Sequence, residues 1–338
     1  MQDDPTTTEQ FPNGVDSRSR SESIGFTADQ MLTCRGCGRQ NPPNRLHCMY
    51  CAQALEIDTE QAEIIRPKFQ VVEPRQNGYN IVVSDNFELI RDAAPDISSI
   101  TGLEPSWIAA AIEPERPMPL MRLGSRNEAD FVVSGLGRLG IVATIVEDET
   151  LMPDRPPIRL RSIEFIESET KFIEFNGETL HSLKSDELVL IVPGILSENR
   201  TDQVEKRSRR KDPKIVDNVQ TGNDEAVLDV YAKNDALGFR VRMAGFDFSC
   251  LGDERSLLAV ENIKRLASVL QDFSPSARFV SEYSTARAAL EQVWPADERR
   301  DTKGVQRGGF GKVDIASTLS SSNLRQFNRF SRLQWHLL

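Results

Sequence analysis

The stretch Met118–Val146, MPLMRLGSRNEADFVVSGLGRLGIVATIV, carries the clearest local fold signal in this chain of 338 residues. Its first six residues read as a strand, and Ser125 with Glu128 matches the capping box that starts a helix. The apolar positions of this helix recur at the spacing of one buried face: Ala129, Val132, Val133 and Leu136. Gly140 is placed to end the helix, and the apolar run 141–146 predicts a second strand. The stretch therefore predicts a β-α-β unit.

This pattern of strand, S-x-x-E helix start and L-G-I strand resembles small bacterial α/β modules that occur as regulatory or adaptor domains. The resemblance implies a small α/β module over residues 67–150 without catalytic activity. The glycines near the helix end do not form a nucleotide-binding fingerprint, because they do not open the helix at its positive N-terminus. Upstream, residues 69–72 predict a short strand, and residues 97–112, which include Trp107, predict short helices.

Four cysteines form the strongest chemical signal, in two C-x-x-C pairs separated by ten residues: Cys34, Cys37, Cys48 and Cys51. Each pair can direct two sulfurs to one point, and two such turns complete a tetrahedral thiolate site. Gly38 follows the first pair, where such a turn commonly needs a positive φ. We therefore predict one structural zinc per chain, in a ribbon over residues 29–56.

Residues 32–55 resemble the bacterial zinc ribbons written C-x-x-C-G…C-x-x-C, with Ala52 in place of the usual second glycine. The resemblance implies a metal-folded ribbon and says little about function. A redox C-x-x-C is the alternative interpretation, which the doubled spacing disfavours. A catalytic zinc is disfavoured because four thiolates leave no open coordination position. Replacement of one ligand by His47 stays open as a minor alternative.

Composition and net charge limit the classes of function that the chain can have. The net charge is −10, from 41 Lys and Arg against 51 Asp and Glu, so the surface as a whole disfavours non-specific binding to nucleic acid or anionic membrane. No run of about 18 apolar residues predicts a transmembrane segment, and the polar residues 1–28 predict disorder. Zinc-type cysteines with no secretory signal predict a cytoplasmic location.

From residue 158 the hydrophobic period shifts toward two. The predicted strands are 158–165, 171–175, 179–183, 188–196, 227–232, 239–243 and 246–250, followed by a helix after Gly252 and another over 276–294. About seven strands closed by a helix resembles the element order of bacterial pleckstrin-homology-like (PH-like) domains, over residues 158–295. The resemblance concerns element order only and implies no lipid binding. An unrelated antiparallel sheet packed on one helix is the alternative.

Residues 296–320 are polar and predict a flexible linker. In the amphipathic tail, residues 321–338, apolar residues share one side and three arginines share another. Phe327, Phe330 and Trp335 would be unfavourable to leave exposed. They are candidate partner contacts, but packing on the chain's own β domain is favoured over docking on a partner or membrane surface.

The basic run 206–211 lies in the long connection between two predicted strands. It could contact phosphates, although a solvated loop is favoured because no aromatic residues interleave for base stacking. A nucleophilic role for Cys250 is disfavoured, because only His181 lies in the same predicted domain as a base.

We therefore predict an α+β multidomain protein without enzymatic activity, acting as a protein–protein interaction scaffold or regulatory adaptor. The ribbon would present four residues to a partner: Arg35, Arg39, Met49 and Tyr50. The alternative is a nucleic-acid-associated regulator that uses the arginines of the ribbon and of the basic run.

Overall fold

The computed structural model describes residues 31–42, 48–53, 55, 69, 72–73, 76–177, 180–208, 211–309 and 312–338. The chain divides into two compact units, Met1–Gln61 and Ala62–Leu338, and its fold is mixed α+β. The disorder predicted for residues 1–28 lies outside the described residues, as do His47, Arg209 and Arg210. Within the described ranges, no helix is long and apolar enough to cross a membrane.

A three-stranded sheet begins the second unit, in the order β4-β3-β5. Its part of the chain contains β3 (Tyr79–Val83), α2 (Phe87–Asp92), α3 (Ala94–Thr101), α4 (Pro105–Ile112), β4 (Met118–Leu123), α5 (Arg126–Arg138), β5 (Ala143–Glu147) and α6 (Asp148–Leu151). The predicted capping box is confirmed, because the Glu128 backbone N–H donates to Ser125 Oγ at 3.3 Å. Strand β3 lies between β4 and β5 and runs antiparallel to both, so the two predicted strands are not direct neighbours.

The strand predicted at residues 69–72 lies partly outside the described residues, which include Phe69 and Val72 but not 70 and 71. Phe69 and Val72 lie outside any strand, and the described part of the small sheet begins at Tyr79–Val83. This strand is buried along nearly its whole length, and it carries the buried polar residue Asn80 among its apolar residues. The polar residue interrupts the apolar run, which is why the sequence pattern did not indicate a strand there.

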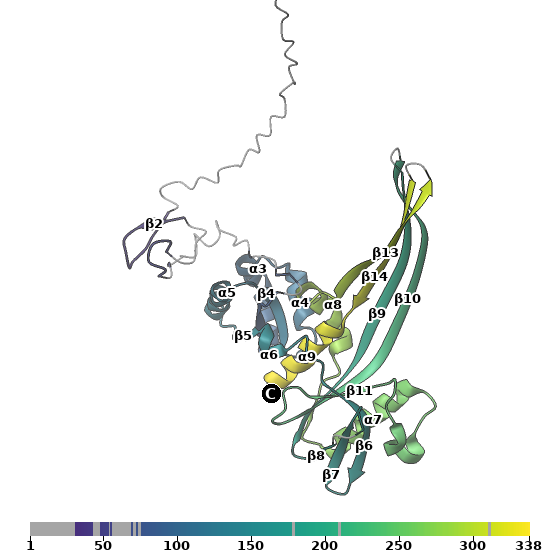
Figure 1. Ribbon diagram of the computed structural model, residues 1–338. Coiled ribbons are helices and arrows are strands. Elements are labelled where there is room, and N and C mark those ends of the chain that lie inside the picture. Colours follow the sequence, from purple (N-terminus) through teal and green to yellow (C-terminus); the bar gives the residue numbers. More distant parts are fainter. Residues whose placement is uncertain are drawn as a thin grey trace, which may run out of the picture. The chain divides into compact units, whose positions relative to one another are not determined.

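A large curled sheet forms the rest of the unit, in the order β13-β14-β9-β10-β11-β6-β7-β8 (Figure 1). Its strands are β6 (Ile158–Ile166), β7 (Glu169–Glu174), β8 (Leu180–Lys184), β9 (Leu188–Ser208), β10 (Lys211–Ala232), β11 (Phe239–Arg242), β13 (Asp297–Gly309) and β14 (Lys312–Ser322), and the short β12 (Arg278–Phe279) also pairs with β9. The accompanying helices are η2 (Phe248–Glu254), α7 (Ala259–Phe273), α8 (Tyr283–Val293) and α9 (Leu324–His336).

The strand predicted over residues 246–250 is wrong, because Asp247 accepts a hydrogen bond from the Ser249 backbone N–H at 3.0 Å and starts the 3₁₀ helix η2.

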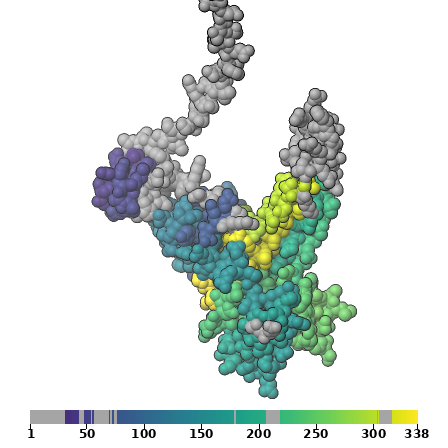
Figure 2. All heavy atoms as spheres, in the orientation of Figure 1, coloured from purple at the N-terminus to yellow at the C-terminus, as the bar shows by residue number. Residues whose placement is uncertain are grey.

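Strands β9 and β10 extend far beyond their predicted bounds, to 21 and 22 residues. Where a linker was predicted over residues 296–320, β13 and β14 pair with each other, and β14 also pairs with β9. We call the extension formed by β9, β10, β13 and β14 beyond the base of the sheet the arm. Figures 1 and 2 show the arm projecting away from the helices of the unit. Its residues are polar on both faces, so they lack the apolar alternation from which strands are predicted. Pairing between neighbouring backbones defines these strands instead.

Both faces of the sheet base are covered. Along β10, Val227 and Tyr231 belong to one apolar cluster, whereas Leu228 and Val230 belong to the other. The first cluster includes α8 and α9 together with the small sheet, and the second includes α7. Because the first cluster also contains Ile81 and Leu136, its core crosses the boundary predicted between modules 67–150 and 158–295.

Helix α9 packs inside the unit, as the favoured interpretation of the tail predicted. Phe327 and Phe330 are fully buried against Tyr283 of α8, with ring centroids 4.8 and 5.3 Å from that ring. A Cβ atom at Gly194 of β9 would lie 2.3 Å from the Phe327 ring. The glycine therefore permits close packing of α9 on a continuing strand.

The polar side of α9 is buried as well. Ser331 Oγ donates to Tyr231 Oη at 2.9 Å, and Gln334 donates to the Pro117 carbonyl at 2.8 Å. The Arg332 guanidinium donates to four main-chain carbonyl groups: Leu151, Met152, Arg155 and Leu237. These bonds replace water around groups that would otherwise be unfavourable to bury.

Two buried ion pairs complete this packing. Asp229 of β10 accepts two hydrogen bonds from Arg240 of β11, at 2.6 and 2.8 Å, and Arg240 also donates to Asn328 of α9 at 2.9 Å. The second pair is centred on Asp148, the first residue of α6. Both carboxylates are buried, so Asp229 without Arg240 would be an uncompensated buried charge, whereas Asp148 has two arginine partners.

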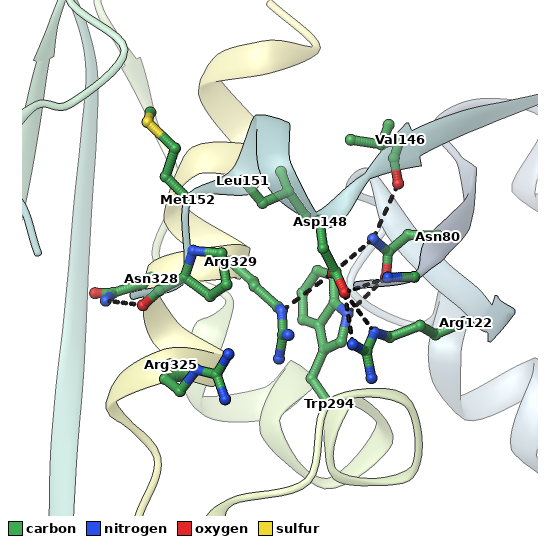
Figure 3. Close-up of polar contacts among 12 residues, drawn as sticks. Asn80, Arg122, Val146, Asp148, Leu151, Met152, Trp294, Arg325, Asn328 and Arg329 are labelled. Carbon is green, nitrogen blue, oxygen red and sulfur yellow. Dashed lines mark hydrogen bonds and ion pairs between the residues drawn. The ribbon is translucent and has the colours of Figure 1, made fainter. Parts of the chain in front are cut away.

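Asp148 receives arginines from two directions (Figure 3). Arg122 Nε of β4 donates to its Oδ2 at 2.7 Å, and Arg329 Nε of α9 lies 3.3 Å from its Oδ1. Asn80 donates to Asp148 at 3.1 Å and accepts from the indole N–H of Trp294 at 2.8 Å. Burial lowers the pKa of Arg329 to about 10, against the opposing effect of Asp148. This cluster ties α9 and the end of α8 to the small sheet.

We expect Phe327→Ala to lower the free energy of unfolding by about 3–5 kcal/mol, because a fully buried aromatic side chain leaves a cavity between α8 and β9. Leu338→Ala, at a half-exposed position beyond α9, should change it by less than about 0.5 kcal/mol. Denaturant unfolding of both variants checks this. Equal unfolding midpoints for Phe327→Ala and the wild type would show that α9 does not contribute to the core.

Candidate metal centre

Two similar loops hold the four cysteines in the first unit. Strands β1 (Leu32–Thr33) and β2 (Gln40–Asn41) pair antiparallel around the first loop. The Cys34 N–H donates to the Arg39 carbonyl at 3.0 Å, and the Cys48 N–H donates to the Gln53 carbonyl at 2.8 Å. The two loops therefore repeat the same main-chain hydrogen bond at the same spacing, and each brings one C-x-x-C pair into a tight turn.

The residue after each C-x-x-C pair has a left-handed conformation. Gly38 has φ +69° and Ala52 has φ +60°, and their N–H groups donate to the Cys34 and Cys48 carbonyls at 2.8 and 2.9 Å. Ala52 thus occupies the position of the usual second glycine and adopts the glycine conformation. A side chain in this region is strained relative to glycine, so the substitution changes the energy of the loop without changing its path.

The four sulfur atoms converge. All lie within 4.8 Å of one another, and the separations of Cys34 from Cys51 and of Cys37 from Cys48 are 3.5 and 3.4 Å. A tetrahedral ion with metal–sulfur bonds of about 2.3 Å would set these separations at about 3.8 Å. The donor set therefore fits a four-coordinate metal that favours thiolates. All five cysteines of the chain are free thiols rather than disulfides.

Cys48 receives the most hydrogen bonds among the four ligands. Tyr50 N lies 3.4 Å from its sulfur and Asn41 Nδ2 lies 3.5 Å from it. Burial acts to raise the pKa of the Cys48 thiol, but these bonds, with those from Cys51 and Cys37, lower it to about 6. For Cys51, the Gln53 backbone lowers the pKa, whereas the neighbouring thiols and burial raise it to about 12.

Asn41 is the supporting residue that the sequence analysis missed. It is fully buried, donates to the Arg39 carbonyl at 2.9 Å, and accepts from the Met49 N–H at 2.8 Å. Its side chain therefore joins the first loop to the second. In the sequence, the role of Asn41 was indicated only by its position between the two cysteine pairs. Asparagine is too common at such positions to predict a supporting role.

The four predicted partner residues of the ribbon are exposed: Arg35, Arg39, Met49 and Tyr50. The Arg39 guanidinium lies over the Tyr50 ring, 4.5 Å from its centroid, so these two residues form one surface across the two loops. Met49 and Tyr50 each expose more than half of their surface.

The predicted partner residues of the tail are placed differently. Phe327 and Phe330 are buried in the second unit's own core, and Trp335 is half-buried, with its indole N–H bonded to the Ala232 carbonyl at 3.1 Å. The apolar surface of Phe327 and Phe330 that made them candidates is covered by the chain itself, and contact of these three residues with a partner stays a prediction. Cys250 is half-buried in η2, and burial raises its pKa to about 11. Its thiol is therefore not an activated nucleophile.

The paired loops predict opposite effects of two reciprocal substitutions. Ala52→Gly should tighten divalent-metal binding about fivefold, and Gly38→Ala should weaken it about fivefold, because each alters the strain of a left-handed residue by about 1 kcal/mol. A Cβ atom at Gly38 meets nothing within 4 Å, so this change acts on the backbone alone.

Competition titration against a chelator measures both affinities. The double variant should return close to the wild-type value, because the two effects oppose each other at separate sites. Effects of the same sign in the two single variants would contradict the equivalence of the loops.

Comparison with known proteins gives no relative for this chain: no protein-family model, no curated protein and no solved structure matches it. The nature of the site therefore follows from its own chemistry, which is that of four converging cysteine sulfurs able to hold a metal ion.

Proposed function

We propose that the cysteine cluster binds one Zn²⁺ per chain as a structural ion that folds the first unit. The observation that supports this is the convergence of four sulfurs from two equivalent loops. Zinc favours tetrahedral thiolate sets, and among the residues of this unit that the structure describes the apolar cluster consists of Leu32, Cys34, Cys48 and Leu55. So small a core needs the metal to stabilise it.

The chain then acts without catalysis, as a protein–protein interaction scaffold or regulatory adaptor. A zinc with four thiolate ligands has no open position for water or substrate, which supports a structural role for the ion. The ribbon offers a partner the exposed surface of Arg35, Arg39, Met49 and Tyr50. Arginine, methionine and aromatic residues are enriched where proteins contact one another.

The finer domain descriptions belong to the same proposal. Strands β6 to β11 followed by α7 keep the element order of a PH-like domain, although β9 and β10 continue into the arm. Helix α5 connects β4 to β5, and β3 lies between these two strands in the sheet. This topology is compatible with the small regulatory module that we propose. Free thiols and a zinc-type cysteine set support a cytoplasmic location, because thiols persist in a reducing compartment.

Purified protein should contain close to one zinc per chain. The double substitution Cys34→Ser and Cys51→Ser should remove it, because two of the four ligands are lost, while the melting transition of the second unit stays unchanged. Elemental analysis and calorimetry measure the two quantities. Iron in place of zinc, or a disulfide without metal, would overturn the proposed cofactor.

The adaptor role is tested by a surface variant that keeps all four ligands. Substitution of the four exposed ribbon residues by alanine should lower the affinity for a captured and then purified partner at least tenfold, because three aromatic or arginine anchors are lost. The zinc content should stay unchanged. A matched control carries alanine at four other exposed positions: Arg91, Arg138, Val142 and Leu258. Equal loss in the control and the ribbon variant would reject the ribbon as the contact surface.

A further inference from the structure

Arg329 of α9 is a buried cation for which the described residues supply no hydrogen-bond acceptor. The residue is 3% exposed, and its Nε is enclosed and unbonded, although it lies 3.3 Å from Asp148 Oδ1 in an ion pair. Its other polar contact in the described part of the chain is the Trp294 ring, whose centroid lies 6.0 Å from the guanidinium carbon. A guanidinium carries five N–H donors, and a buried donor without an acceptor is unfavourable.

Other buried arginines around α9 are well bonded. Arg240 donates three hydrogen bonds to side-chain oxygens, at 2.6, 2.8 and 2.9 Å, and Arg332 donates to four main-chain carbonyls. Arg122 donates to Asp148 at 2.7 Å and to two main-chain carbonyls. The fold therefore supplies acceptors to these three arginines, and Arg329 departs from that pattern.

The buried charges around Asp148 do not balance. The side chains of Arg122 and Arg329 are each 3% exposed, and that of Asp148 is 1% exposed, so two enclosed cations face one enclosed carboxylate. Burial lowers the pKa of Arg329 to about 10, with Arg122 and Arg325 acting in the same direction and Asp148 and Asp297 against them. The enclosed group thus carries one positive charge more than its own carboxylate can compensate.

The next carboxylates outward are engaged by Arg325, which lies one helical turn before Arg329. Arg325 Nε is 2.9 Å from Asp154 Oδ1, and Arg325 Nη1 is 3.4 Å from Asp297 Oδ1. The side chains of the two aspartates are 74 and 34% exposed, so both carboxylates lie toward solvent. Neither of them forms a hydrogen bond with Arg329 in the described part of the chain.

The free end of Arg329 has the geometry of an oxyanion site. Figure 3 shows its terminal nitrogens pointing away from Asp148, with the guanidinium groups of Arg325 and Arg122 on either side. Because Nε is enclosed, an ion can reach the guanidinium only at these terminal nitrogens. A planar guanidinium offers paired N–H groups that match two oxygens of one oxyanion. An ion held there would supply acceptors and also balance the second buried cation.

We propose that the terminal nitrogens of Arg329 bind a free oxyanion, such as inorganic phosphate. Because only 3% of the side chain is exposed, the position suits a free ion and not a phosphate group carried by a large molecule. Arg329 lies on α9 and Asp148 on α6, so the ion would stabilise the docking of these two helices on each other. This inference concerns the second unit and is independent of zinc.

The test titrates inorganic phosphate into the full chain by calorimetry, in phosphate-free buffer at an ionic strength held constant with sodium chloride. The wild type should bind one phosphate per chain. Arg329→Gln should weaken binding about a hundredfold, because two charge-assisted hydrogen bonds are lost. Arg329→Lys should weaken it about tenfold, because an ammonium group keeps the charge but lacks the paired N–H geometry.

Denaturant unfolding separates ion binding from a structural role of Arg329. Without phosphate, Arg329→Gln should unfold at a midpoint close to that of the wild type, because Asp148 keeps Arg122 and an unbonded buried cation is removed. Phosphate at about 10 mM should then raise the midpoint of the wild type and leave that of the variant unchanged. A lower midpoint of the variant without phosphate, together with an equal effect of phosphate on both proteins, would overturn the proposal.

Arg138→Gln is the matched control, because it removes one arginine charge at an exposed position at the end of α5. This variant should bind phosphate as the wild type does. An equal loss of binding in the control would show that phosphate follows net charge alone, and this result would overturn the proposal. Absence of phosphate binding to the wild type would also overturn it, as would equally tight binding of adenosine monophosphate, which a site for a free ion should exclude.

Discussion

The burial of α9 on both its apolar and its polar sides is the constraint on which the second unit depends. Its phenylalanines pack between α8 and β9, and its polar residues bind main-chain carbonyls from the loops before β6. Arg329 extends this packing to the buried carboxylate of Asp148, and Asn328 extends it to Arg240, the partner of Asp229. One helix thereby joins the small sheet to the large sheet, and one of the unit's two apolar clusters extends over both of the modules that the sequence suggested.

The two units reach stability by different means. In the second unit, apolar clusters cover both faces of the base of the large sheet. Because these clusters hold the base of the long strands, the arm that continues from the same strands can remain polar. The described part of the first unit has four residues in its apolar cluster, and two of them are cysteines. In the proposed function, metal coordination supplies the stability that so small a cluster cannot. Because of this difference, we expect substitutions at Gly38 and Ala52 to change metal affinity through the loop backbone. Substitution of Phe327 should instead change the free energy of unfolding through packing.

Local signals in the sequence predicted local structure well. The capping box at Ser125, the helical spacing around Trp107 and the doubled C-x-x-C were each specific enough to locate a helix or a site. The arm was missed because its strands are defined by pairing with distant neighbours, and polar residues on both faces give no periodic pattern. The amphipathic pattern of α9 identified its apolar side. It could not show that Arg329 and Arg332 are buried too, since their partners lie far away in the sequence.

The position of α9 in the chain has a consequence for biosynthesis. Every element that it contacts precedes it, so β9, α6 and α8 leave the ribosome before the helix that fills the space between them. Until α9 arrives, Tyr283 and the apolar side of β9 lack their main cover. Nascent chains with such unfilled apolar surface are prone to associate, and chaperones commonly shield them. The packing of this cluster is thus completed only after α9 itself has been synthesised, so the order of the elements along the chain sets the order of their assembly.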